Sequence, residues 1–258
     1  LLEVLERARR PVDCFIRDDD GGWDNERQIA LLDATAAAAV PIDLAVIPMA
    51  LDGAMARELI RRIDSGMQPL GVHQHGLSHT DHQTETGGRK CEFGPAREPE
   101  LQRLDLSNGW NQLLRQFGPL LDPIFTPPWN RCAAETPHVL SGLSYAALSR
   151  SRGATAQQVL PELPVDLDWC KQHRAGGPEA IVHAWARDLG ARIDDGLPFG
   201  LMLHHAAMEA AGVDAPYLCR GEACGQCETN MVSCDGSILH GDHWLSPEEH
   251  AEGRKIMP

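Results

Sequence analysis

The chain has 258 residues, of which 43% are hydrophobic and 23% charged, and this ordinary balance excludes the disordered and collagen-like classes. Its formal net charge of -14, from 23 Lys and Arg against 37 Asp and Glu, argues against nucleic acid or an anionic membrane surface as a partner. No stretch approaches the roughly 18 apolar residues of a membrane-spanning helix, and residues 1–10 do not resemble a secretory signal, so we expect a cytoplasmic protein.

Segments typical of strands and helices alternate along most of the chain. The expected strands span residues 12–17, 42–48, 69–75, 123–127, 144–148, 159–166 and 199–205. The expected helices span residues 25–39, 54–65, 100–117 and 179–189. Because strands that alternate with helices form parallel sheets, the pattern predicts an α/β fold, a distorted (β/α)7 barrel with its functional groups at the carboxyl ends of the strands.

Two further segments interrupt this alternation. Residues 76–97, rich in His, Gly, Thr and charged residues, predict a long loop that forms one wall of a pocket. After His205 the content of Gly, Cys and acidic residues rises and helical periodicity ends. We therefore expect a catalytic domain over residues 1–208 and a separate small segment over residues 209–258.

Histidines and aspartates at two expected strand ends suggest a metal site. His75 and His79 are spaced i, i+4, so that on a helical turn both imidazoles would face the same ion, with Asp20 or Asp19 as a third ligand. Two nitrogens and one oxygen leave a fourth position for water, which is the layout of a hydrolytic metal site. The alternative is that the His-rich segment is merely solvated.

Five ordered motifs then resemble one known family. They are Asp18-Asp19-Asp20-Gly21, His75-Gly76-Leu77-Ser78-His79, Phe125-Thr126-Pro127-Pro128-Trp129-Asn130, Asp166-Leu167-Asp168-Trp169 and Leu203-His204. In order and approximate separation they are similar to the motifs of the polysaccharide deacetylases, the NodB homology domain of carbohydrate esterase family four. The resemblance implies a hydrolase that removes an N-acetyl group from an amino sugar, a glycan or a related small amide.

The resemblance also implies roles for the residues that match. Asp19 would be the general base that activates a coordinated water, and Asp20, His75 and His79 would hold a divalent ion, with zinc the expected one. The alternative registration of the acidic run gives these two carboxylate roles to Asp18 and Asp19. Gly21, directly after the run, favours Asp19 and Asp20.

Two more residues complete the implied mechanism. The backbone N–H of Trp129 would help to hold the oxyanion, and His204 would protonate the departing amine. His205 is the alternative acid, because adjacent residues of a strand face opposite sides and only one of the two reaches the pocket.

The sequence departs from the family at one position. Thr126 stands where the family has an arginine that orients and ionises the base, and Arg17 and Arg131 are the candidates to replace it. We expect Trp169, next to Asp168, to pack beneath the site as a structural residue.

The cysteines fall into two groups. Cys14, Cys91, Cys132 and Cys170 are isolated, and we expect them to be reduced. Cys219, Cys224 and Cys227 have the spacing C-x4-C-x2-C, which is the plant-type ligand pattern of a [2Fe-2S] cluster. The surrounding residues resemble the C-terminal ferredoxin domain of oxygenase reductases, so electron transfer to a redox partner is the alternative function.

This C-terminal resemblance is incomplete. The fourth cluster ligand would lie beyond the Leu-Ser-Pro-Glu-Glu stretch, where the chain stops at Pro258, and the chain starts at Leu1 instead of methionine. We therefore expect a truncated or fused reading frame and a small, truncated ferredoxin-like segment. A zinc knuckle that adds Cys234 or His240 to the three cysteines is a further alternative.

Overall fold

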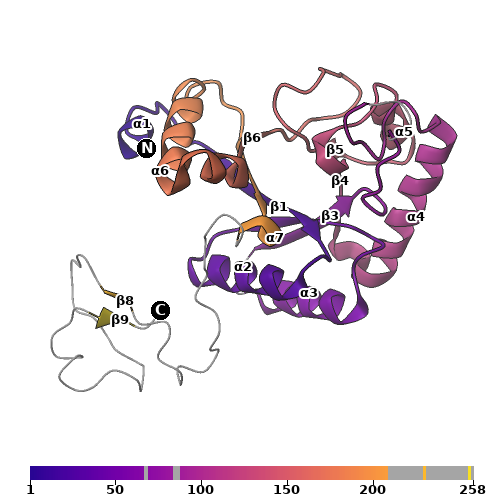
Figure 1. Ribbon diagram of the computed structural model, residues 1–258, viewed down its shortest axis with the longest axis horizontal. Coiled ribbons are helices and arrows are strands. Elements are labelled where there is room, and N and C mark those ends of the chain that lie inside the picture. The colour runs from indigo at the N-terminus through magenta and orange to yellow at the C-terminus, as the bar shows by residue number, and fades with distance from the viewer. Residues whose placement is uncertain (67–68, 84–87, 209–228, 231–254, 257–258) are drawn as a thin grey trace. The chain divides into compact units, whose positions relative to one another are not determined.

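The chain divides into two compact units, Leu1–Val213 and Asp214–Pro258. The computed structural model describes residues 1–66, 69–83, 88–208, 229–230 and 255–256 (Figure 1). In the second unit, β8 (Thr229–Asn230) pairs antiparallel with β9 (Lys255–Ile256). The proposed ligands of the iron-sulfur cluster and of the zinc knuckle, Cys219, Cys224, Cys227, Cys234 and His240, lie outside the described residues.

The first unit contains a seven-stranded sheet in the order β5-β4-β3-β2-β1-β7-β6. The strands, all paired in parallel, are β1 (Cys14–Gly21), β2 (Ile42–Val46), β3 (Leu70–His75), β4 (Leu121–Thr126), β5 (Ala147–Leu148), β6 (Val165–Asp168) and β7 (Phe199–His204). The helices and turns are α1 (Leu2–Leu5), α2 (Asn25–Ala37), α3 (Gly53–Ser65), α4 (Pro99–Phe117), η2 (Gly118–Leu120), η3 (Pro128–Asn130), α5 (Thr136–Gly142), α6 (Trp169–Gly190) and α7 (His205–Met208).

The sheet curls, and its two edge strands, β5 and β6, share no ladder (Figure 1). Isolated bridges, Leu148 to Glu162 and Ser151 to Val165, connect the segments at these edges. The predicted α/β architecture, a distorted barrel with seven parallel strands, is therefore confirmed. Among the described residues, none of the helices is long and apolar enough to cross a lipid bilayer.

Three predicted strands were wrong in their extent. The strand expected over residues 12–17 continues to Gly21, as β1, and therefore includes the acidic run Asp18-Asp19-Asp20. The strand expected over residues 159–166 forms later, as β6, because Pro161 and Pro164 lack the N–H groups that a sheet requires. The strand expected over residues 144–148 shortens to β5. The helix expected over residues 179–189 is confirmed as the part of α6 that follows a break at Gly176 and Gly177, and an unpredicted helical stretch that begins at Trp169 precedes this break.

Local sequence explains the regular elements. In α3 the buried side chains, Met55, Ala56 and Leu59, recur at the helical spacing and pack on the core. The helix begins at Asp52, whose side chain accepts the N–H groups of residues 54 and 55 at 2.8 Å, and ends at a left-handed Gly66. Such helices cover the apolar sheet and leave the carboxyl ends of its strands free to carry polar side chains.

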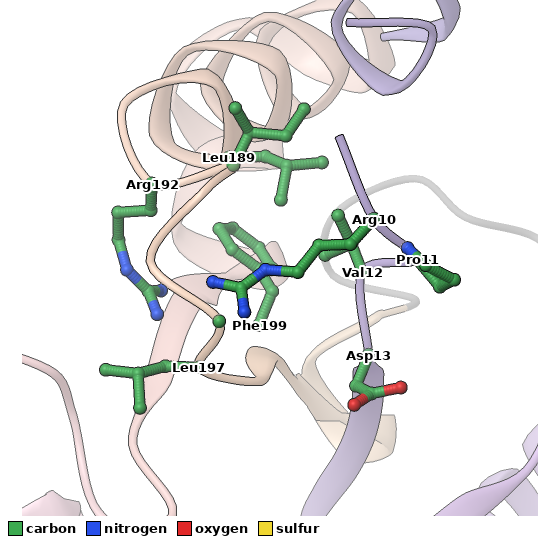
Figure 2. Close-up of a pocket in the computed structure, with 10 residues that line it drawn as sticks. Arg10, Pro11, Val12, Asp13, Leu189, Arg192, Leu197 and Phe199 are labelled. Atoms are coloured by element: carbon green, nitrogen blue, oxygen red, sulfur yellow. The ribbon is translucent and has the colours of Figure 1, made fainter. Parts of the chain in front are cut away.

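The opposite edge of the sheet, where the strands begin, contains a small cavity of about 120 Å3. Figure 2 shows the Arg10 side chain extending from the segment before β1 across Phe199 and toward Leu197. Its Nη2 donates to the carbonyl oxygen of Asp194 at 2.6 Å. This contact ties the segment before β1 to the loop before β7, and residues at the amino-terminal edge of such a sheet serve stability.

Candidate metal and catalytic site

Asp20, His75 and His79 meet at the carboxyl edge of the sheet. Asp20 lies near the end of β1, His75 ends β3, and His79 follows in the next loop. Asp20 Oδ1 lies 3.3 Å from His75 Nε2 and 3.2 Å from His79 Nε2, and the three ligand atoms all lie within 4.8 Å of one another. The sequence therefore predicted which residues meet here.

The geometry that unites the two histidines differs from the expected helical turn. His75 belongs to a strand, and the chain then reverses through left-handed residues, Gly76 at φ 62° and His79 at φ 58°. The expectation of a helical turn is therefore wrong. A tight loop brings the second imidazole back toward Asp20.

The three side chains fit a divalent cation. His75 Nδ1 lies 3.0 Å from the carbonyl oxygen of Thr126, and since a carbonyl only accepts, Nδ1 carries the proton of the neutral ring. Nε2 then presents a lone pair to Asp20 Oδ1, an oxygen that is buried and makes no hydrogen bond. Facing lone pairs call for a positive charge between them, and one carboxylate with two imidazoles is a donor set that zinc and similar ions accept.

The pKa shifts of Asp20 and His75 are also consistent with a cation at this site. Burial opposes ionisation of Asp20, yet the neighbouring His75 and His79 hold the pKa of that carboxyl far below its ordinary value. Burial likewise opposes the charged form of His75, but the close contact with the Asp20 carboxylate and the negative charge of Asp19 raise its pKa. Both directions describe a site that favours a cation beside the carboxylate.

Asp19 is held by a buried arginine on its own strand. Arg17 Nε lies 2.6 Å from Asp19 Oδ1 and Arg17 Nη2 lies 2.9 Å from Asp19 Oδ2, and both side chains are 1% exposed. Ser149 Oγ and Asn130 Oδ1 accept further hydrogen bonds from the guanidinium, at 2.7 and 2.6 Å. Although burial would raise the pKa of Asp19, Arg17 with the nearby histidines lowers it, so the carboxylate is ionised.

Of the two candidate arginines, the structure thus brings Arg17 and not Arg131 to the carboxylate. Arg131 donates to the carbonyl oxygen of Lys90 at 3.1 Å. Thr126 is buried, and its hydroxyl lies 2.9 Å from His73 Nε2. The arginine that pairs with Asp19 therefore comes from β1.

His204 and His205 have different surroundings. His204 is the neighbour of Asp19 in the β1–β7 register, its Nε2 lies 4.0 Å from Asp19 Oδ2, and its side chain is 26% exposed. His205 is buried, and its Nδ1 lies 2.7 Å from Asp18 Oδ2 while its Nε2 lies 2.6 Å from the carbonyl oxygen of Trp23. Burial opposes its charge, but Asp18 raises the pKa of His205 to about 9. The geometry therefore places His204, and not His205, beside Asp19 and leaves Asp18 occupied in an ion pair.

A second set of possible ligand atoms surrounds His204. Asp168, Cys170 and His204 place ligand atoms within 4.8 Å of one another. Burial raises the pKa of the Cys170 thiol to about 11, and Asp168 accepts the N–H of Lys171 at 2.9 Å as the N-cap of α6. A protonated thiol is a poor ligand, so this set does not fit a metal as well as the first.

Two tryptophans flank the side chain of His79. The His79 ring lies between Trp129, at 4.3 Å, and Trp23, at 4.9 Å between ring centroids. Trp129 has φ 56°, and its backbone N–H donates to no acceptor in the described part of the chain. Trp169 packs against the core and stacks on His173 at 5.0 Å, as expected of a structural residue.

Sequence reasoning missed the role of Glu92. This buried carboxylate accepts hydrogen bonds from the N–H groups of Leu77 and Ser78 at 3.3 and 2.9 Å, and from Ser78 Oγ at 3.1 Å. A Cβ at residue 76 would collide with it, so the loop requires Gly76. The only sequence signal was a carboxylate in an apolar setting, Cys91-Glu92-Phe93.

Solved structures of a CE4 esterase and of a chitin deacetylase have an architecture similar to that of this chain. The chain superimposes on a CE4 esterase of Streptococcus mutans with a TM-score of 0.52, 14% identity, and coverage of 81% of this chain and 82% of that one. The chitin deacetylase of the fungus Colletotrichum lindemuthianum gives a TM-score of 0.52, 18% identity, and coverage of 79% and 78%. The fold is that of the CE4 esterases. The resemblance that the five motifs indicated is thus confirmed at the level of the fold.

The C-terminal region is similar to different proteins. Residues 198–255 match the family described as a 2Fe-2S iron-sulfur cluster binding domain. The reductase subunit of a toluene-4-sulfonate monooxygenase system of Comamonas testosteroni is 49% identical over 51 residues. The heme-dependent oxidative N-demethylase beta subunit of Ectopseudomonas mendocina is 48% identical over 52 residues. These alignments span 20% of this chain and 16% of the relatives.

The iron-sulfur family match starts inside the first unit. Its beginning overlaps β7, which lies in the large sheet between β1 and β6. The similarity to a ferredoxin segment is confirmed for the sequence, while the limits of residues 1–208 and 209–258 remain a prediction.

Proposed function

We propose that residues 1–208 form a metal-dependent deacetylase that hydrolyses the N-acetyl group of an amino sugar, a glycan or a related small amide. The observation that carries this proposal is the buried Asp20 Oδ1, which has no hydrogen bond and faces the Nε2 atoms of His75 and His79. The shared CE4 fold supports a hydrolase of this kind. With the acidic net charge, the proposed partner is an acetylated sugar or small amide, not nucleic acid or a membrane.

The base in this proposal is Asp19. Arg17 holds it ionised and fixes both of its oxygens, so that the carboxylate takes a proton from the attacking water. A divalent ion bound by Asp20, His75 and His79 would acidify that water and polarise the acyl carbonyl. Asn130 Nδ2 lies 3.4 Å from Asp19 Oδ2 and helps to orient the base.

The remaining roles belong to His204 and Trp129. His204, at the exposed side of Asp19, gives its proton to the departing amine nitrogen. The N–H of Trp129 donates to the oxygen on which negative charge develops. Trp23, 41% exposed, offers an apolar face beside the site on which a sugar ring can stack.

Metal analysis and acetate release test the proposal together. Purified full chain is expected to contain about one zinc or a similar divalent ion at this site and to release acetate from members of a panel of N-acetylated sugars. His75→Ala is expected to lose both the ion and the activity. His138→Ala, which removes an exposed histidine of α5, is the matched control. Equal metal content and activity in His75→Ala and the wild type would contradict the assignment.

A second candidate function rests on the C-terminal match. The iron-sulfur family model and the cysteines Cys219, Cys224 and Cys227 favour a [2Fe-2S] electron-transfer segment with a redox partner. It predicts iron with equimolar labile sulfide and visible absorbance, all lost in Cys224→Ser. Zinc without labile sulfide would leave the hydrolase as the better function for this chain.

A further inference from the structure

A large hollow lies directly beside the candidate catalytic site. Its volume is about 570 Å3, within the ordinary range of small-molecule pockets. Trp129 and Asn130 line it. Trp129 also contacts the ring of His79, and Asn130 contacts Asp19 and Arg17. The hollow and the catalytic site therefore share a wall.

The lining of this hollow is positive, although the chain is strongly acidic. It includes Arg89, Arg131, Arg150 and Arg152, and among the residues that the structure describes no Asp or Glu lines it. Arg150 forms a salt bridge with Glu162 at 2.6 Å, and Arg152 forms a salt bridge with Asp166. Two of the four charges are thus accounted for by structural ion pairs.

Arg89 and Arg131 differ from these two arginines. Within the part of the chain that the structure describes, neither forms a salt bridge, and the Arg131 guanidinium is fixed by its hydrogen bond to the carbonyl oxygen of Lys90 at 3.1 Å. Burial and the charge of Arg89 both lower the pKa of Arg131, so the two cations are close enough to repel each other. An anion placed between them would relieve this repulsion and accept planar, charge-assisted hydrogen bonds.

We propose that this hollow, defined by Arg89 and Arg131, binds an anionic group of the substrate, a carboxylate or a phosphate carried by the N-acetylated sugar or its neighbour. The inference rests on the proposed deacetylase function, because it places the acetamide at Asp20, His75 and His79 while the anion extends past Trp129. It narrows the substrate class from acetylated sugars in general to acidic ones.

Three small sugars test this inference with the full, metal-loaded chain. N-acetylglucosamine is neutral, N-acetylmuramic acid adds a carboxylate, and N-acetylglucosamine 6-phosphate adds a phosphate. At low ionic strength, kcat/KM for acetate release is expected to be about tenfold or more higher for at least one acidic sugar, mainly through KM. Which acidic sugar is preferred distinguishes a carboxylate from a phosphate.

Variants of the two arginines test binding of the anionic group separately from catalysis. Arg131→Gln and Arg89→Gln are each expected to reduce the preference for the acidic sugar about tenfold. Arg89 is exposed, so its variant keeps the test valid if the Arg131 variant folds poorly. Arg115→Gln removes an equal charge from the exposed side of α4 and is the matched control.

Calorimetric binding of the same three sugars distinguishes the two proposals. Preferential binding of an acidic sugar that Arg89→Gln abolishes, without acetate release from any substrate, would support the pocket and refute the deacetylase. Acetate release at equal kcat/KM from neutral and acidic sugars, unchanged by both arginine variants, would overturn the pocket and leave the deacetylase in place.

Discussion

Arg17 is the residue on which the proposed base depends most. Its buried guanidinium donates two hydrogen bonds to Asp19 and further hydrogen bonds to Ser149 and Asn130. A lysine keeps the charge but offers only a compact ammonium group, so it cannot make these planar contacts at once. The orientation and the ionisation of Asp19 are therefore properties of an arginine at this position.

Arg17→Lys is expected to lower kcat about 100-fold, because a misplaced base loses most of the gain of general-base catalysis. Weaker stabilisation of the carboxylate also raises the pKa of Asp19, so the acidic limb of the pH–rate profile moves to higher pH. Acetate release across pH 5 to 9, with bound metal measured in parallel, checks both effects. A loss of activity with an unchanged profile would show that Arg17 only supports the fold, and Arg115→Lys is the control.

Strand alternation explains how far sequence alone resolves these residues. Arg17 and Asp19 are two positions apart on β1 and share a face, whereas Asp18 points to the other side and meets His205. Asp20, His75 and His204 lie at strand ends, which parallel pairing brings to one edge. Arg17 remained one of two candidates in the sequence, because choosing between it and Arg131 requires the path of a loop.

At the scale of elements, hydrogen bonds to a buried carboxylate hold the loop after β3 that carries His79. Glu92 ties together the N–H groups of Leu77 and Ser78, and this turn places the second imidazole against Asp20. Hydrogen bonds of this kind orient a metal ligand and tune its affinity for the ion. Their partners lie 14 or 15 residues apart in sequence, with no periodic pattern, so the sequence did not reveal them.

Glu92→Gln is expected to weaken metal binding about 10- to 100-fold, because a glutamine presents at most one amide oxygen to the loop N–H groups and carries no charge. Competition with a chelator of known affinity measures the dissociation constant without reference to activity. Glu98→Gln, at the exposed start of α4, removes the same charge without touching the loop. Identical dissociation constants for the Glu92 variant and the wild type would refute a positioning role for Glu92.

Two departures from the predicted elements have a local cause in the sequence. Pro161 and Pro164 delay β6, and Gly176 with Gly177 divides α6 just before Pro178. The long, strongly apolar strands in the middle of the sheet were found, because their apolar residues form a core that any α/β arrangement must bury.

At the scale of the molecule, the carboxyl ends and the amino ends of the sheet strands have separate roles. The carboxyl edge carries the candidate site, while the amino-terminal edge carries Arg10 and a pair of aspartates, Asp43 at the start of β2 and Asp122 at the start of β4. The two carboxylates flank Gly71 of β3, where a Cβ would collide with Asp43. Burial, and next the charge of Asp122, raise the pKa of Asp43 to about 6.

This raised pKa makes the stability of the fold depend on pH. The folded-state pKa of Asp43 exceeds its ordinary value of 3.8, so its contribution is fully present below about pH 4 and is lost as pH rises through about 6. At pH 8 the ionised pair therefore destabilises the sheet, and Asp43→Asn, which keeps the shape and adds a donor toward Asp122, is expected to raise the unfolding free energy by about 1–3 kcal/mol.

Thermal unfolding at pH 8 and pH 4 measures this effect as a gain of a few degrees in Tm that disappears at the lower pH. Asp64→Asn removes an exposed aspartate of α3, and its Tm should match that of the wild type at both pH values. Because Asp43 lies at the edge opposite the candidate site, the same variant should retain its metal and its acetate release. A Tm that falls at pH 8 would mean that the ionised carboxylate has a favourable partner and that the two aspartates do not oppose each other.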